Sequence, residues 1–180
     1  MTMEELLLSL SQNFDNEAQQ IVNYIRTNAE YSSDLFEQTY SFTNLTQRPS
    51  KIRGRKGAYV FLITQPVSLD YQTVFRWNNV AGAGFKLYNQ ASLAVGDCLY
   101  AGACTTQSLY SRMTAHFADG GSCTGLKLSH PNRRIAHDSV CVYTFILKKE
   151  LERYSTIVLP QIEKRLHTLL KPKAGSSRVS

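Results

Sequence analysis

Three short runs of mainly apolar residues stand out along the 180-residue chain, at 58–63, 97–103 and 140–147. Gly and Pro residues bound the first run, and all three are shorter than an ordinary helix. A continuous apolar run of this length is typical of a strand that is buried on both faces of a sheet. The pattern therefore predicts three core strands.

A later segment carries apolar residues at helical spacing. Residues 107–118 place Leu109 and Met113 on one side of a helix, and Thr105 or Thr106 can cap its first turn. The pattern predicts a helix between the second and third strands.

A last helix is predicted from about Pro160, in its first turn, to Leu170, because Pro172 stops it. The predicted order of the main elements is β-β-α-β-α. This order indicates an α/β protein of the α+β kind, with a small mixed three-stranded core sheet and flanking helices.

The N-terminal part of the chain differs from the rest in pattern and in charge. A capping box and a leucine stripe predict helices within residues 1–47, where residues 33–47 are ambiguous and a further short helix is one interpretation. This part has one basic and seven acidic side chains, a net charge of −6. Residues 48–180 have 19 basic and seven acidic ones, a net charge of +12. We expect an acidic N-terminal helical extension and a basic body of the kind that binds polyanions.

Several general features narrow the class of protein. Residues 65–96 mix Pro, Gly and Asn with aromatic residues and look like an insertion, with a hairpin as one interpretation. The four cysteines lack the spacing of a zinc site and are interpreted as reduced, structural thiols. No apolar run is long enough for a membrane span, and the first residues lack the features of a secretory signal. We therefore expect a cytoplasmic globular protein.

Three polar side chains lie within or beside the apolar stripes of the predicted helices. Glu163 comes four residues after Leu159 and three before Leu166, where a carboxylate needs a boundary position, a cation or a raised pKa. Arg112 and His116 are four residues apart and share a helix face, so together they can hold an anion. The alternatives are a boundary glutamate that reaches solvent and a simply solvated helix face.

Two strand motifs, Gly57-Ala58-Tyr59 and Tyr100-Ala101-Gly102, add a further pattern. Together with Arg112, His116 and Glu163 they resemble, in the same order along the chain, the signature of the GIY-YIG nuclease family, with Ala in place of the family's middle Ile. The resemblance implies a nuclease domain whose candidate catalytic residues are Tyr59, Tyr100, Arg112, His116 and Glu163.

The resemblance extends from about Gly57 to Pro172, with three departures. Residues 65–96 are inserted between the two tyrosine motifs, Ala103 stands where the family often has Lys, and Gly175 stands where it often has Asn. The residues expected to replace the phosphate contact of the missing lysine are Lys127, Arg133 or Arg134.

The resemblance also implies a role for each candidate residue in phosphodiester hydrolysis. Glu163 would hold a single Mg²⁺ or Mn²⁺, which stabilises the leaving oxygen as a Lewis acid. Arg112 would clamp the phosphate. Tyr59 is the expected general base toward water, and His116 is the alternative because histidine titrates near neutral pH. Tyr100 would help to position the water.

Basic and amide side chains outside this set are candidates for contact with the polymer. Those expected to bind nucleic-acid phosphates are Lys51, Arg53, Arg55, Lys56, Lys86, Lys127, Arg133 and Arg134. Those expected to read bases from the insertion are Trp77, Asn78, Asn79, Lys86 and Gln90. For each of them a surface loop without a nucleic-acid contact is the alternative interpretation.

The expected function is therefore a metal-dependent endonuclease that hydrolyses double-stranded DNA, sequence-specific in the manner of a restriction enzyme. Such an enzyme would cut both strands as a homodimer, with the N-terminal helices as its interface. One alternative is a structure-specific or weakly specific nuclease of repair, mobile elements or phage defence. Another is a non-catalytic nucleic-acid-binding protein on a decayed nuclease fold. A further hypothesis is that the acidic segment masks the site.

Overall fold

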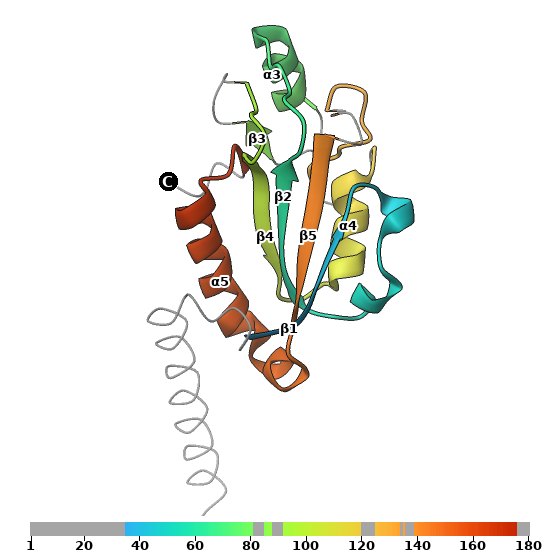
Figure 1. The fold of residues 1–180 in the computed structure, drawn as a ribbon, viewed down its shortest axis with the longest axis vertical. Helices are drawn as coiled ribbons and strands as arrows, with labels where there is room; N and C mark the ends of the chain where they lie inside the picture. Colours follow the sequence, from blue (N-terminus) through green and yellow to red (C-terminus); the bar gives the residue numbers. More distant parts are fainter. Residues whose placement is uncertain are drawn as a thin grey trace, which may run out of the picture.

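The computed structural model of this chain describes residues 35–80, 85–87, 92–119, 125–133, 135 and 139–175. A four-stranded antiparallel sheet lies at the centre of the described part (Figure 1). Its strands, in their hydrogen-bonded order, are β1 (Phe36–Phe42), β5 (Val140–Leu147), β2 (Gly57–Ile63) and β4 (Cys98–Cys104). The helices predicted before residue 35 lie outside the described residues.

Helices and short elements surround this sheet. The helices are α3 (Tyr71–Asn78), α4 (Leu109–Phe117) and α5 (Ser155–Leu170). The short 3-10 helices are η1 (Leu45–Gln47), η2 (Ser50–Ile52) and η4 (Lys149–Tyr154), and a second sheet of two strands consists of β3 (Lys86–Leu87) and β6 (Ala174–Gly175). The predicted class, a mixed α and β fold with helices flanking a sheet, is confirmed.

The sheet contains a strand that the sequence pattern did not predict. A short helix was one interpretation of residues 33–47, and it is wrong for residues 36–42, which form β1. This strand pairs antiparallel with β5, from Phe36 opposite Leu147 to Phe42 opposite Val142. Aromatic residues that alternate with polar ones favour a strand with one buried face. The main sheet therefore has four antiparallel strands rather than three mixed ones. Residues 36–42 belong to this sheet and not to a separate extension.

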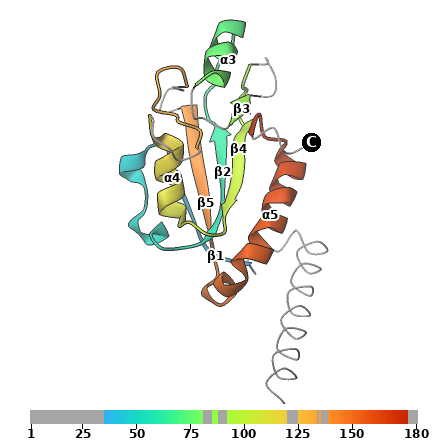
Figure 2. The ribbon, with the colours of Figure 1, turned by 180° about the vertical axis from the view of Figure 1, so that it is seen from behind.

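The two long helices cover opposite faces of the sheet (Figures 1 and 2). On one face, α4 packs over an aromatic core that includes Tyr59, Phe61 and Tyr100. On the other face, α5 packs over small and branched side chains, among them Ala58 and Val60. Alternate residues of β2 thus face different helices, as the two-residue period of a strand requires.

Both helix starts differ from the predicted positions. Ser108, rather than Thr105 or Thr106, caps α4 by accepting a hydrogen bond from the backbone N–H of Ser111. The helix α5 begins at Ser155, so Pro160 lies inside it. Pro160 lacks an N–H, but its exposed position lets water bind the carbonyl that loses its helical partner.

The insertion is tied to the body at both of its ends. Val67 and Leu93 form an isolated antiparallel bridge that closes it. Its strand β3 pairs with β6 near the end of the described chain rather than within a hairpin of its own. In α3, the buried indole of Trp77 donates a hydrogen bond to the carbonyl of Phe85 across 3.2 Å. The insertion is thus a packed extension of the domain.

Two general expectations can be compared with the described residues. Cys98 and Cys104 are buried free thiols, and Cys141 is a half-buried one. Burial raises the pKa of both Cys98 and Cys104 to about 12, so these two thiols are held neutral. Across the described part of the chain, none of the helices combines the length and the apolar character needed to cross a membrane.

Candidate active site

The candidate site lies at the free edge of β4. Among the described strands only β2 pairs with it, and α5 runs along its other side, where the N–H of Lys173 donates to the carbonyl of Cys98 (Figures 1 and 2). The hydroxyl of Ser155 donates to the carbonyl of Thr105 across 3.3 Å, and Nε2 of His167 lies 2.9 Å from the carbonyl oxygen of Ala101. Glu163 lies between Ser155 and His167 on α5. At this edge of the sheet it is near enough to Tyr100 and Arg112, on the α4 side, for an electrostatic effect.

The position of Gly102 leaves no space for a larger side chain. Tyr59 of β2 pairs with Gly102 of β4, and the phenol ring crosses directly over it. A Cβ atom at Gly102 would lie 2.5 Å from the Tyr59 hydroxyl oxygen and 2.7 Å from Cζ. The glycine of the second motif therefore leaves the space that the tyrosine of the first motif occupies.

Gly57, on the neighbouring strand, also has no space for a side chain. A Cβ atom there would lie 2.0 Å from the carbonyl oxygen of Phe145 and 2.9 Å from Cδ1 of Leu109. The absence of a side chain lets β5 and the first turn of α4 both approach β2. The two motifs thus encode close packing as well as candidate chemistry.

Tyr59 is the centre of the hydrogen bonds in this region. Its hydroxyl oxygen accepts from Nε of Arg112 across 3.1 Å and lies 2.9 Å from Nε2 of His116. The backbone N–H of Leu126 donates to Nδ1 of His116 across 3.1 Å, so Nδ1 carries no proton. His116 is therefore a neutral imidazole that donates its Nε2–H to Tyr59.

Burial controls the titration of both partners. His116 is fully buried, which lowers its pKa well below the usual 6.5, and the charges of Arg112 and Lys127 lower it further. Burial also raises the pKa of Tyr59 well above 10, and the nearby Arg112 opposes this increase only in part. Both groups are consequently neutral near pH 7.

The loop residues that fix His116 were not predicted from the sequence. A Cβ atom at Gly125 would lie 2.2 Å from the carbonyl oxygen of Ala115, so only glycine lets this loop pack against α4. The close approach places Leu126 at the imidazole and lets the N–H of Leu128 donate to the carbonyl of His116 across 2.9 Å. The only signal in the sequence was the glycine itself, in a segment interpreted as a loop.

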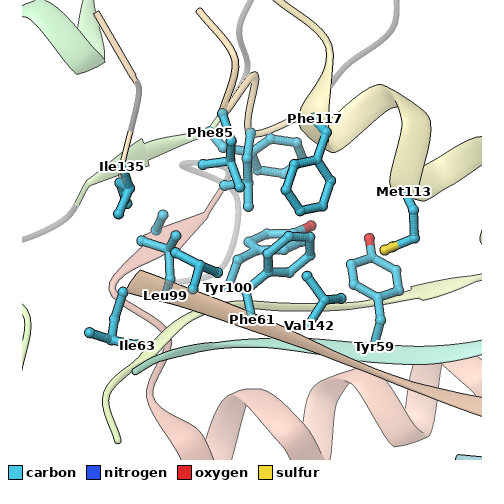
Figure 3. Packing of buried hydrophobic residues seen from close by; sticks show 14 of the residues in the cluster. Tyr59, Phe61, Ile63, Phe85, Leu99, Tyr100, Met113, Phe117, Ile135 and Val142 are labelled. Atoms are coloured by element: carbon cyan, nitrogen blue, oxygen red, sulfur yellow. The ribbon is translucent and has the colours of Figure 1, made fainter. Parts of the chain in front are cut away.

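Tyr100 extends the cluster toward α5. Its ring centroid lies 6.0 Å from that of Tyr59 and 5.1 Å from that of His116, and Figure 3 shows both tyrosines pointing to the same side of the sheet. Burial raises the pKa of Tyr100 to about 12, although hydrogen bonds to Tyr59 and Arg112 oppose the increase. Two phenols and an imidazole therefore surround the guanidinium of Arg112.

Arg112 connects this buried cluster to a cavity. The cavity has a volume of about 180 Å³ and is lined by the turn between β4 and α4, residues 103–107, and by Arg112. The guanidinium is partly buried and lies 5.6 Å from the centroid of the Phe85 ring. A cationic side chain at the wall of a cavity of this size is suited to bind an anionic group such as a phosphate.

Glu163 is the carboxylate next to this cluster. It is half-buried, and no described residue forms a hydrogen bond or an ion pair with it. Burial raises its pKa, while the nearby His167 and Arg112 oppose the increase. No set of three or more metal-ligating His, Cys, Asp or Glu side chains occurs in the described residues. A single unpaired carboxylate nevertheless fits a hard cation that takes its other ligands from water and phosphate.

The basic residues predicted to bind nucleic acid divide into exposed and buried ones. Lys51, Arg53 and Lys86 are exposed. Lys56 is half-buried, and its Nζ bonds the carbonyls of Thr106 and Gln107 at the rim of the cavity. Arg134 lies outside the described residues.

Three of the predicted basic contacts are instead buried or held in ion pairs within the protein. Arg55 forms ion pairs with Glu152 and Glu37, whereas Lys127 is only 2% exposed. Arg133 is 1% exposed and donates to the carbonyl of Trp77 across 2.9 Å, and burial lowers its pKa to about 10. These positions argue against direct contact of the three side chains with a polymer.

The proposed base readers also have structural contacts. Asn78 exchanges two hydrogen bonds with the backbone of Leu87, and the side chain of Asn79 donates to the carbonyl of Phe75. Trp77 is buried, and Gln90 lies outside the described residues. Lys86 remains as an exposed candidate.

One surface arrangement was not foreseen. The guanidiniums of Arg48 and Arg53 both lie over the ring of Tyr110, with Cζ at 3.3 Å and 4.7 Å from its centroid. Neither arginine forms an ion pair with a carboxylate of the described residues. The pair therefore presents positive charge beside α4.

The site thus combines a guanidinium held by two phenols, a neutral imidazole that bonds one of these phenols, an adjacent cavity, and a carboxylate without a partner among the described residues. Comparisons with protein-family models, with curated proteins and with solved structures found no match for this chain.

Proposed function

We propose that this protein is a metal-dependent endonuclease that hydrolyses phosphodiester bonds in double-stranded DNA, with the sequence specificity of a restriction enzyme. One observation carries the proposal. Arg112, held by Tyr59, stands at the wall of a cavity and within the electrostatic influence of Glu163, a half-buried carboxylate that has no hydrogen-bond or ion-pair partner among the described residues. Four of the five residues that carry the resemblance to GIY-YIG nucleases contact one another, although β2, β4 and α4 contribute them. The fifth, Glu163 of α5, acts electrostatically with Tyr100 and Arg112.

Arg112 binds the phosphate in this proposal. Tyr59 accepts from its Nε, and Tyr100 also bonds the guanidinium, so these contacts fix the plane of the group. A guanidinium whose orientation is fixed loses less entropy when it binds two phosphate oxygens. Tyr59, Tyr100 and His116 therefore act first as positioning residues for Arg112.

Neither of the expected general bases is ready to accept a proton in this geometry. Burial keeps Tyr59 a phenol, because its pKa is raised well above 10. The accepting nitrogen of His116, Nδ1, is occupied by the N–H of Leu126. The role that the geometry favours for both side chains is donation and orientation.

Glu163 would hold the metal ion. Its carboxylate has no competing partner among the described side chains, which suits a cation with one protein carboxylate and several other ligands. When bound, Mg²⁺ or Mn²⁺ supplies Lewis-acid stabilisation of charge on the phosphate and on the leaving oxygen. Glu163 itself contributes a fixed negative charge at the edge of β4, within the electrostatic influence of Arg112.

Exposed basic residues would guide the polymer to the cavity. The body of the chain carries a large positive charge, and the candidates that remain accessible include Lys51, Arg53 and Lys86. Such side chains neutralise phosphates without reading sequence. A homodimer in which each copy cuts one strand fits the proposed restriction-type activity.

Plasmid digestion tests the proposal. The wild-type protein, Glu163→Gln and Arg112→Ala are incubated with supercoiled plasmid and Mg²⁺ or Mn²⁺, and the products are separated and their ends sequenced. We expect discrete fragments from the wild type and a loss of at least about a hundredfold in rate from each variant. Glu150→Gln, which removes an exposed carboxylate of η4, is the matched control and should cleave normally.

Full metal-dependent cleavage by Glu163→Gln would overturn the assignment of the site. A smear or cuts confined to branched DNA would instead favour a weakly specific or structure-specific nuclease. DNA binding without any cleavage would favour the non-catalytic alternative, which the Ala and Gly at positions 103 and 175 motivate.

A further inference from the structure

His167 is a polar residue of α5 that the chemistry described above does not use. Its Nε2 lies 2.9 Å from the carbonyl oxygen of Ala101, in the free edge of β4. A carbonyl can only accept, so Nε2 carries the proton in this hydrogen bond. The contact therefore fixes both the ring and its protonated nitrogen.

The second ring nitrogen of His167 has no assigned task. No described residue forms a hydrogen bond with Nδ1. In the neutral imidazole this nitrogen has a lone pair in the ring plane. The edge of β4 thus holds His167 in the tautomer that leaves Nδ1 able to bind a cation.

His167 and Glu163 lie on the same face of α5. They are four residues apart, the spacing at which helical side chains are neighbours. Ser155, eight residues before Glu163, bonds the carbonyl of Thr105 just after β4, so α5 is tied to this strand near both of its ends. His167 is also near enough to Glu163 to influence it electrostatically, because it opposes the rise in the pKa of Glu163 that burial causes.

We propose that His167 is a second protein ligand of the metal ion, binding through Nδ1 beside the carboxylate of Glu163. Histidines that ligate metals typically donate their other ring N–H to a carbonyl or carboxylate, which is the arrangement at Ala101. This inference rests on the proposed function for the presence of a metal, and it adds a nitrogen ligand to a site that otherwise has a single carboxylate.

A nitrogen ligand has a consequence for metal preference. Imidazole suits transition metals such as Zn²⁺, Fe²⁺ and Ni²⁺; of the two ions proposed here only Mn²⁺ is a transition metal, and Mg²⁺ prefers oxygen ligands. We expect the protein to bind Mn²⁺ more tightly than Mg²⁺ and His167→Gln to reduce this difference. A purely structural His167, which only bonds β4 near the end of α5, would leave the metal preference unchanged.

Metal binding and its spectroscopy test the inference without any need for cleavage. Mn²⁺ is titrated into the 180-residue protein by calorimetry, and the bound Mn²⁺ is examined by pulsed electron paramagnetic resonance for coupling to a nitrogen nucleus. We expect nitrogen coupling in the wild type, its loss in His167→Gln, and a loss of at least about tenfold in Mn²⁺ affinity in that variant. His130→Gln removes a histidine of the loop after α4 and should bind like the wild type.

The outcomes separate this inference from the proposed function. Nitrogen coupling that requires His167 in a protein without nuclease activity would support the ligand and overturn the function. Plasmid cleavage by a protein whose bound Mn²⁺ shows no nitrogen coupling would support the proposed function and overturn His167 as a ligand. Absence of Mn²⁺ binding, or coupling that persists in His167→Gln, would overturn the inference. If His167→Gln does not fold, the wild-type spectrum still decides, because absence of nitrogen coupling excludes the ligand.

Discussion

His116 donates its Nε2–H to the hydroxyl oxygen of Tyr59 across 2.9 Å. The direction of this bond follows from Leu126, whose backbone N–H occupies the other ring nitrogen. Arg112 donates to the same oxygen, so two N–H groups converge on it. Both lone pairs of the phenol oxygen are then used, and its own proton must point to a third group. Tyr59 is therefore an acceptor that holds two helix side chains in place.

Tyr59→Phe should lower both stability and cleavage. The substitution leaves the buried Nε2–H of His116 and the Nε–H of Arg112 without their acceptor, and a buried unsatisfied donor costs about 1–3 kcal/mol. We expect urea unfolding to show a loss in this range, and plasmid cleavage to fall by about a hundredfold because Arg112 is no longer oriented. The two measurements use the same purified protein.

Tyr40→Phe is the matched control for the loss of a phenol hydroxyl. The hydroxyl of Tyr40 is buried and has no hydrogen-bond partner among the described residues. Its removal should leave the free energy of unfolding unchanged or slightly higher, because no bond is lost and a desolvated group disappears. Equal destabilisation by the two substitutions would contradict the central position of Tyr59.

Gly102→Ala should disrupt the site from within the edge strand. The added Cβ would lie 2.5 Å from the Tyr59 hydroxyl oxygen, so the phenol must move away from Arg112 and His116. Overpacking of a core typically costs about 1–3 kcal/mol. We expect a lower melting temperature in calorimetry, together with a loss of cleavage comparable to that of Tyr59→Phe.

Gly54→Ala separates this steric effect from the general effect of losing a glycine. Gly54 has a φ of +72°, and no atom of the described residues lies within 4 Å of a Cβ placed there. The variant should lose about 1–2 kcal/mol of stability through backbone strain. Its cleavage rate at a temperature where it is folded should equal that of the wild type. A similar loss of activity in both variants would show that the contact between Gly102 and Tyr59 is not decisive.

The free energy of unfolding should depend on pH through His116. The pKa of His116 is lowered well below 6.5 in the folded protein, because burial disfavours the charged ring. Below pH 6.5 the unfolded chain binds a proton that the folded protein does not, so stability falls as the pH decreases, by up to about 1.4 kcal/mol per pH unit. Above pH 6.5 this group contributes no pH dependence. Urea titrations between pH 7.5 and 5 measure the slope.

Glu163 acts in the opposite direction and at lower pH. Its pKa is raised above 4.5 in the folded protein, so protonation of this group favours the folded state as the pH falls toward 4.5. The pH dependence caused by His116 is therefore measured in a Glu163→Gln variant, which lacks the opposing contribution of Glu163 to the free energy of unfolding. There, His116→Gln should flatten the slope between pH 6.5 and 5. A slope that persists would assign the dependence to other groups.

The core strands were predictable because their signals are local, whereas the candidate residues were selected through the resemblance of several separate segments to one family signature. A continuous apolar run identifies β2 and β4 without knowledge of their neighbours, and both are buried along nearly their whole length. The strand β1 was missed because only one of its faces packs against the body, so apolar residues are sparse in it. Its pairing with β5 joins segments about a hundred residues apart, which no local pattern can reveal.

Partners that are distant in the sequence also explain which basic residues were misinterpreted. Arg53 and Arg55 are equivalent in the sequence, since both belong to one basic connector. Their surroundings differ because Glu152, 97 residues further along the chain, lies beside Arg55 only. Likewise, Arg133 is buried beneath α3, where it bonds the carbonyl of Trp77. A basic residue becomes a structural ion or a polymer contact through tertiary partners that charge patterning does not contain.

This difference makes Arg53 and Arg55 a matched pair for a test of nucleic-acid binding. Arg53 is exposed, lies over Tyr110 and has no carboxylate partner among the described side chains. Arg53→Gln should weaken DNA binding at every sequence and reduce the slope of log affinity against log salt by about 1, as the loss of one phosphate contact requires. Its stability should change by less than about 0.5 kcal/mol, since it is a surface substitution.

Arg55→Gln should show the converse. Arg55 donates to Glu152 across 2.7 Å and to the carbonyl of Leu147 across 3.0 Å, so its loss leaves partly buried acceptors without a donor. Lys149 still lies 3.0 Å from the other oxygen of Glu152, which limits the expected cost to about 1–3 kcal/mol. The salt slope of DNA binding should equal that of the wild type. If Arg55→Gln lowers the slope while Arg53→Gln does not, the DNA path lies along the Glu152 side of the connector.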